Sequence, residues 1–121
     1  ISPPSISQEA AISAFLADEE LVGKVKSYTR NRELLLRELP KIGFDDFAPV
    51  DGAFYFFVNV SQLSDDSSEF CRRMLAETGV AATPGIDFDP VRGQAYVRFS
   101  FAGAFEDIQE AVTRLQIWLK E

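Results

Sequence analysis

The sequence predicts an α+β fold, in which a small, largely antiparallel sheet is covered by helices. Two segments, residues 52–60 and 93–101, are rich in aromatic and β-branched residues and alternate in the manner of strands. Segments with a helical spacing of apolar residues lie before, between and after them. The chain has 121 residues, of which 46% are apolar, and this is enough for one core. We therefore expect a single domain spanning residues 1–121.

Two helices are expected in the first third of the chain. Residues 6–16 show a short helical spacing of apolar residues, and Ser5 and Ser7 are the candidate N-caps. Residues 18–39 show a long amphipathic pattern, which is interrupted where Arg32 falls on the apolar stripe. We expect Pro40 and Gly43 to end this second helix.

The remaining elements follow from strand patterns and helix caps. Residues 47–50 predict a short strand and residues 52–60 a strong one, whose aromatic residues on both faces favour a central position in the sheet. Asp66 and Glu69 make a capping-box pattern before a third helix, and Gly79 is expected to end it. Residues 80–83 then predict a brief strand, 84–93 a structured loop, the stretch 93–103 the last strand and 105–119 the final helix.

The last strand carries an arginine in the middle of its polar side. Alternation along the strand puts the core residues on one face and Arg98, between Tyr96 and Ser100, on the other. One interpretation is a solvent-exposed arginine with weak partners among the many acidic residues. The other is a planar fork that binds a carboxylate or phosphate through charge-assisted hydrogen bonds. Position in the strand leaves both interpretations open.

The composition argues against several other functions. A net charge of -7 opposes binding to nucleic acid or to anionic membranes, and no apolar run is long enough to span a bilayer. The lack of histidine and the single cysteine, Cys71, rule out the usual zinc sites, and Asp87 and Asp89 lack further acidic residues at calcium-loop spacing. We interpret Cys71 as a small buried hydrophobe and the pair 84–85, Pro-Gly, as a turn. One cysteine fits a reducing compartment, so we expect the protein to be cytoplasmic.

Several stretches taken together point to a family. In chain order they are PPSISQEAAISAF, DGAFYFFVNV, EFCRRMLAETGVAATPGIDF and YVRFSFA, and they cover nearly the whole sequence. Their order resembles the C-terminal small domain of fold-type I pyridoxal-phosphate-dependent aminotransferases, the class I/II aspartate and aromatic aminotransferase superfamily. The resemblance implies that residues 1–121 are the small domain of a larger enzyme, with residues 1–17 as a connecting segment and short helix.

The resemblance also implies roles for individual residues. It makes Arg98 the residue that binds the α-carboxylate of the substrate, and it puts Phe88 near the mouth of the site as a packing or shielding residue. It assigns no catalytic residue, cofactor ligand or metal ligand to this chain, because the family's cofactor-bearing lysine lies upstream. The lysines of this chain read as surface residues instead. Asp89 stands where the family usually has glycine, so we expect the loop after Phe88 to differ from the family pattern.

The implied function is the exchange of an amino group between an amino acid and a 2-oxo acid by a full-length enzyme with pyridoxal phosphate as cofactor. The implied partners are the two substrates, an upstream cofactor-binding large domain and a second copy in a homodimer. We expect the fragment alone to be inactive and not to bind the cofactor. The alternative is a non-catalytic α+β module for amino-acid binding or interaction, in which Arg98 grips a carboxylate for regulation.

Overall fold

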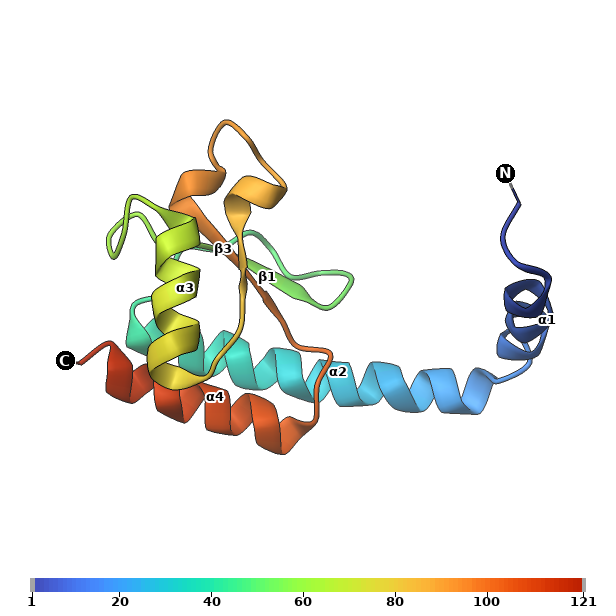
Figure 1. Ribbon diagram of the computed structural model, residues 1–121. Helices are drawn as coiled ribbons and strands as arrows, with labels where there is room; N and C mark the ends of the chain where they lie inside the picture. Colours follow the sequence, from blue (N-terminus) through green and yellow to red (C-terminus); the bar gives the residue numbers. More distant parts are fainter. Residues whose placement is uncertain (1, 121) are drawn as a thin grey trace.

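The computed structural model describes residues 2–120, and it confirms the predicted α+β fold (Figure 1). Helices alternate with three short strands, and one long helix runs along the base of the molecule. The elements in chain order are α1 (Ser5–Ala14), α2 (Asp18–Glu38), η1 (Leu39–Ile42), β1 (Tyr55–Asn59), α3 (Ser67–Thr78), β2 (Thr83–Pro84), η2 (Gly85–Asp87), η3 (Gly93–Ala95), β3 (Tyr96–Ser100) and α4 (Phe105–Trp118).

The sheet has the strand order β1-β3-β2, and both pairs of neighbouring strands are antiparallel. The last strand is therefore central, and the prediction that residues 52–60 form the central strand is wrong. The second aromatic face of β1 misled that prediction, because it is only half-buried on the open side of the sheet. The outer edge of β1 is covered by a single bridge from Phe47 to Val58, where the sequence predicted a short strand. The edge is thus protected without a fourth strand.

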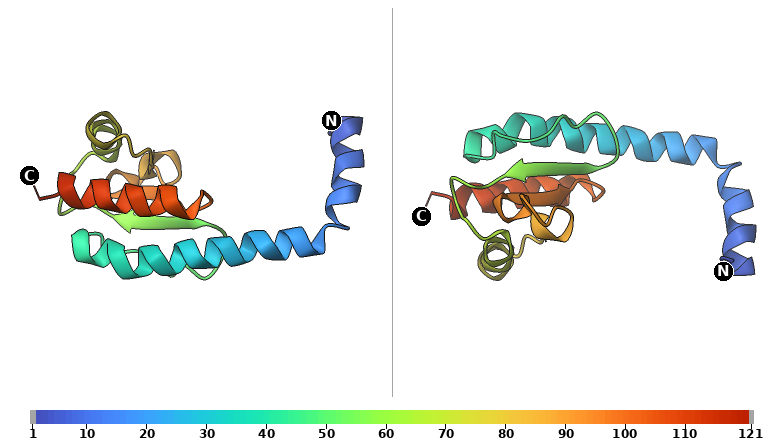
Figure 2. Two further views of the ribbon diagram at one scale, coloured as in Figure 1. Left: turned by 90° about the horizontal axis from the view of Figure 1, so that it is seen from below. Right: turned by 90° about the horizontal axis from the view of Figure 1, so that it is seen from above.

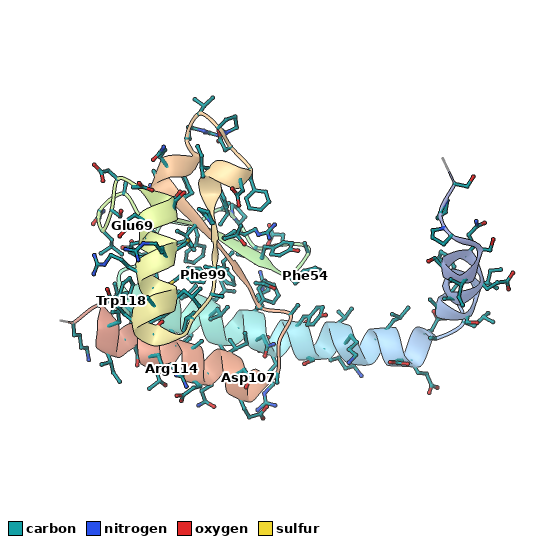
Figure 3. The ribbon with its side chains drawn as sticks, in the orientation of Figure 1. Phe54, Glu69, Phe99, Asp107, Arg114 and Trp118 are labelled. Carbon is teal, nitrogen blue, oxygen red and sulfur yellow. The ribbon has the colours of Figure 1, made fainter. Side chains whose placement is uncertain are left out.

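The hydrophobic core lies between one face of the sheet and helices α2, α3 and α4. Phe56 and Val58 of β1 and Val97 and Phe99 of β3 alternate onto this face and are buried, as the period of two requires. Phe99 points into the interior, whereas Glu69 lies on the outer surface (Figure 3). Within residues 2–120, the α-helices that pack on the sheet, α2, α3 and α4, therefore lie on the core side, and we call the opposite face the open face.

The helix ends can be compared with the caps that the sequence predicted. The η1 turn continues α2 through Pro40 and ends at Gly43, which has a left-handed φ of 93°. Asp66 caps α3 by accepting hydrogen bonds from the backbone N–H groups of Ser68 and Glu69, at 2.9 and 3.0 Å. The Glu69 carboxylate pairs with an arginine one turn later, so only half of the predicted capping box forms. Neither Ser5 nor Ser7 caps α1, and that prediction is wrong, because the N-cap position is Pro4.

Two polar residues of α2 tie this helix to the loops around the sheet. The buried Asn31 side chain donates from Nδ2 to the carbonyl oxygens of Phe101 and Gly103, both at 2.9 Å, just after β3 ends. Arg32, which interrupts the apolar stripe in the sequence, donates from Nε to the carbonyl oxygen of Val50. Each polar side chain thus satisfies backbone acceptors that the connecting segments leave open.

The N-terminal arm, residues 5–25, extends away from the core as α1 and the first half of α2 (Figures 1 and 2). α1 contributes no buried residue. The large apolar side chains of the arm are between 50% and 83% exposed: Ile6, Ile12, Phe15, Leu16, Leu21, Val22 and Val25. So many exposed large apolar side chains in one segment are uncommon on a soluble monomer and are typical of a surface for interaction.

Candidate carboxylate-binding site

The candidate site is built around Arg98, on the central strand and on the open face of the sheet. In the register of the sheet, Arg98 lies opposite Phe57 of β1 on one side and Thr83 of β2 on the other. Its side chain is half-buried, while its neighbours in sequence, Val97 and Phe99, are buried on the core face. Being hydrogen-bonded on both sides, β3 gives this arginine a more rigid base than an edge strand or a loop would give.

Two aromatic rings cover the flat faces of the Arg98 guanidinium. Its central carbon lies 4.2 Å from the centroid of the Tyr55 ring and 4.1 Å from the centroid of the Phe88 ring. Both distances are well inside the range of cation–π attraction. Nη2 also lies 3.5 Å from the hydroxyl oxygen of Thr83, the outer limit of a hydrogen bond. The charged group is therefore held by rings on its faces and is lightly engaged at its edge.

No carboxylate of residues 2–120 forms an ion pair with Arg98 within 4.0 Å. Six other arginines do form such pairs in the same part of the chain: Arg32, Arg37, Arg72, Arg73, Arg92 and Arg114. Arg98 differs from them by lying on a sheet among aromatic side chains. Most of its five N–H donors are thus free for an incoming anion.

A compact loop between β2 and β3 carries Phe88 to Arg98. Gly85 and Gly93 meet backbone to backbone, because a Cβ atom on Gly93 would lie 2.3 Å from the Gly85 carbonyl oxygen. A Cβ atom on Gly85 would lie 2.6 Å from the carbonyl oxygen of Tyr96, so neither position has room for a side chain. The Pro84–Gly85 pair is therefore more than a turn, since it allows the close contact that folds the loop back onto β3.

Asp89 closes the same loop. Its Oδ1 atom accepts hydrogen bonds from the backbone N–H groups of Val91 and Arg92, at 2.9 and 3.0 Å, and its Oδ2 atom accepts one from Arg92 Nε at 3.1 Å. The backbone donors, with the Arg92 side chain, lower the pKa of Asp89 below its usual value of 3.8. Asp89 thus serves as a local cap in the turn that follows Phe88, at the position where the sequence departs from the family pattern.

The neighbours that sequence alternation placed beside Arg98 turn out to have other partners. Tyr96 stacks on Phe57, with ring centroids 4.9 Å apart and planes only 2° from parallel. The Ser100 hydroxyl accepts a hydrogen bond from the backbone N–H of Ala102 at 3.4 Å. Tyr55 and Thr83 do contact Arg98, and the sequence analysis did not identify them as its neighbours. Their contact depends on strand register, which local patterns do not encode.

The other candidate residues have structural positions. Cys71 is buried in the core, and burial, together with nearby Asp87, raises its pKa to about 11, so the thiol stays protonated and unreactive. Residues 2–120 hold no group of three or more side chains that could bind a metal ion, and no helix among them is long and apolar enough to cross a membrane. The lysines are all exposed, at the ends or outer faces of helices: Lys24, Lys26, Lys41 and Lys120.

The fold and this site define a helix-covered α+β module whose open sheet face carries a half-buried arginine with no ion-pair partner within residues 2–120. The chain belongs to the aminotransferase class I and II family, whose model matches residues 1–115. It is 53% identical, over 98% of its length, to the valine–pyruvate aminotransferase of Mycobacterium tuberculosis, and it covers 31% of that protein. It is 37% identical to the (5-formylfuran-3-yl)methyl phosphate transaminase of Methanocaldococcus jannaschii, with all of this chain and 32% of that protein covered.

A solved structure gives the same result for the fold. The chain matches the crystal structure of an aminotransferase from Mycobacterium tuberculosis with a TM-score of 0.92 and 52% identity, covering 98% of this chain and 31% of that one. The chain thus spans about a third of the length of the relatives it matches. Those relatives are named for different substrates, so similarity alone does not select a substrate for this chain.

Proposed function

We propose that residues 1–121 are the C-terminal small domain of a pyridoxal-phosphate-dependent aminotransferase, called the parent enzyme below. The parent enzyme exchanges an amino group between an amino acid and a 2-oxo acid. Family membership and the length of the relatives support this proposal. The exposed apolar surface of the N-terminal arm supports it as well, because residues 1–17 and the start of α2 are then the segment that joins and packs against an upstream large domain.

Within this proposal, Arg98 binds the α-carboxylate of the amino-acid substrate. The observation that carries this role is a guanidinium with aromatic rings on both faces and no ion-pair partner within residues 2–120. A planar fork and a planar carboxylate form two parallel hydrogen bonds, which fix both the position and the rotation of the substrate. An arginine already paired with an aspartate or glutamate would have to break that pair before binding. Arg98 is free of this cost.

Phe88 serves in the proposal as the outer wall of the carboxylate site. It is half-exposed, it directly follows η2 in the loop that Gly85 and Asp89 hold, and its ring covers one face of the guanidinium. Its position excludes water from that face and strengthens the charge-assisted bonds at the edge. Phe88 thereby shields the ion pair between Arg98 and substrate.

Among residues 2–120, Arg98 and its neighbours fit a substrate subsite of such an enzyme, and no lysine lies in a setting that fits the cofactor. The open face carries an anion-binding fork, whereas the lysines lie exposed on helices or beyond them, and Lys41 pairs with Glu38 at 3.0 Å. Pyridoxal phosphate, when bound by the rest of the parent enzyme, supplies the electron sink for breaking the substrate's Cα–H bond. Arg98 contributes by orienting the substrate for that step. The proposal includes a cytoplasmic homodimer, as is implied by the family.

Replacement of Arg98 by lysine in the parent enzyme tests the role of the fork. We expect Arg98→Lys to lower kcat/KM for amino acids about ten- to a hundredfold, because a point charge on a flexible stem loses the two-point contact. Activity on a matching amine without a carboxylate should be the same in both enzymes. Arg72→Lys, an exposed arginine on α3, is the matched control and should leave both activities unchanged. Equal losses on both substrates would assign Arg98 a structural role.

Experiments on the isolated chain test whether cofactor binding and activity require the proposed large domain. We expect the isolated chain to show no transaminase activity, and borohydride should trap no pyridoxal phosphate on a unique lysine when the cofactor is sub-stoichiometric. Trapping on one lysine would contradict the proposal. The parent gene gives a second check, since it should encode a large upstream domain with a cofactor-binding lysine. A gene lacking that domain would instead favour the non-catalytic binding module.

A further inference from the structure

We propose that Tyr55 and Phe88 form an aromatic clamp that positions the Arg98 guanidinium and restricts an incoming carboxylate to the plane of the fork. The proposal rests on the function proposed above and adds a positioning role for two residues. Tyr55 comes from β1 and Phe88 from the loop after β2, so they reach the arginine from separate parts of the sheet. The sandwich is therefore a tertiary feature of the domain.

The geometry explains how a clamp of this kind would work. The guanidinium carbon is 4.2 Å from one ring centroid and 4.1 Å from the other, so both flat faces of the cation are occupied. All five N–H donors of an arginine lie in the plane of the group, and only the edge stays open to an anion. A long side chain normally loses rotamer freedom when it binds a ligand. Because the two rings already hold the Arg98 guanidinium in place, less rotamer freedom is lost on binding. A carboxylate can then approach only in the plane of the guanidinium, where it forms two hydrogen bonds.

The two rings have different supports, and this gives them different parts in the clamp. Tyr55 is half-buried in β1, and its ring also packs against Phe54, with centroids 4.4 Å apart. Phe88 is 50% exposed and lies in the loop that the Gly85–Gly93 contact and the Asp89 turn fold. Tyr55 is thus the fixed inner support, and Phe88 is the outer ring. Loss of either ring opens one face of the cation to water.

Leucine substitutions in the parent enzyme test the clamp. We expect Tyr55→Leu and Phe88→Leu each to lower kcat/KM for amino acids about tenfold, mainly through KM, and to leave activity on a carboxylate-free amine unchanged. Tyr55→Phe and Phe88→Tyr keep the rings and should retain activity within about twofold. Phe57→Leu is the matched control, because Phe57 stacks on Tyr96 on the same face. In an Arg98→Lys background, the leucine variants should add little further loss.

A measurement that does not need activity separates this proposal from the proposed function. In the 121-residue chain, nitrogen-edited NMR of the guanidinium groups should show slow rotation for Arg98 and faster rotation for the exposed Arg37, which is held by a single hydrogen bond from Nε to Glu38. Tyr55→Leu and Phe88→Leu should speed the rotation of Arg98 alone. Rotation of Arg98 as fast as that of Arg37 in the wild type, or leucine variants that lose activity equally on both substrates, would overturn the clamp. A parent enzyme without transaminase activity, but with a slow Arg98, would overturn the proposed function and leave the clamp standing.

Discussion

The two faces of the sheet use similar residues for different purposes. On the core face, Phe56 and Phe99 are 0% and 7% exposed under the helices. On the open face, Tyr55 and Phe57 are half-buried and arranged in pairs, one against Arg98 and one against Tyr96. Aromatic content is therefore a poor guide to burial in this strand pair. What separates the faces is the position of α2, α3 and α4, which pack against the core face.

The difference between the faces also separates stability from recognition. Burial of a large ring removes apolar surface from water, and this favours the folded state. A ring that lies over a cation on a partly exposed surface gains less from burial, and it controls where the charge points. Substitutions on the core face should therefore change the free energy of unfolding, whereas substitutions on the open face should change binding.

The largest expected effect is that of Phe99→Ala on the core face. Removal of a buried phenylalanine leaves a cavity, and we expect a loss of about 3–5 kcal/mol in the free energy of unfolding. Phe57→Ala, the matched substitution on the open face, loses one stacked ring pair, worth about 0.5–1.5 kcal/mol beyond burial, and only a half-buried ring, so it should cost clearly less than Phe99→Ala. Urea unfolding of the chain followed by circular dichroism measures both. Equal losses would mean that the two rings are buried alike and that the two faces do not differ in their contribution to stability.

A smaller loss of stability is expected when the contact between Asn31 of α2 and the end of β3 is removed. Asn31→Ala removes both hydrogen bonds to the Phe101 and Gly103 carbonyl oxygens, and it should cost about 1–3 kcal/mol, because the buried Phe101 oxygen is then unsatisfied. Thr29→Ala, at an exposed position two residues earlier on α2, should change stability by less than about 0.5 kcal/mol. The same denaturant measurement applies. If both variants unfold like the wild type, Asn31 does not anchor the strand.

The smallest effect concerns the loop on the open side. The pKa of Asp89 is lowered in the folded chain, so its ionised form supports the loop at pH values above the usual 3.8, and this support is lost as the pH falls through the lower folded value. We therefore expect hydrogen-exchange protection of the Val91 and Arg92 amides to fall as the pH drops below about 3.8. Asp89→Asn keeps an acceptor oxygen and should show no such pH dependence. If the wild type and Asp89→Asn lose hydrogen-exchange protection with pH in the same way, ionisation of Asp89 is not the cause of that loss.

The sequence predicted most elements because their signals are local. The apolar spacing of α2, the Asp66 cap of α3 and the glycines that end both helices act within a few residues, so they can be recognised without a structure. The strand order was not predictable, since aromatic residues on both faces of β1 suggest burial and recognition equally well. The loop chemistry of Asp89 was equally hidden, because an aspartate is common in any exposed turn.

The sequence by itself determined that Arg98 lies on the side of β3 opposite the core, because side-chain alternation along a strand has a fixed period of two. It also determined, by resemblance, the family to which the chain belongs. Only the tertiary structure decided which residues surround the arginine. Tyr55 and Phe88 reach it through the register of β1 against β3 and through the fold of the loop over Gly85 and Gly93. The strand register and the loop fold both depend on contacts between segments far apart in the chain. Local residue patterns do not predict such contacts.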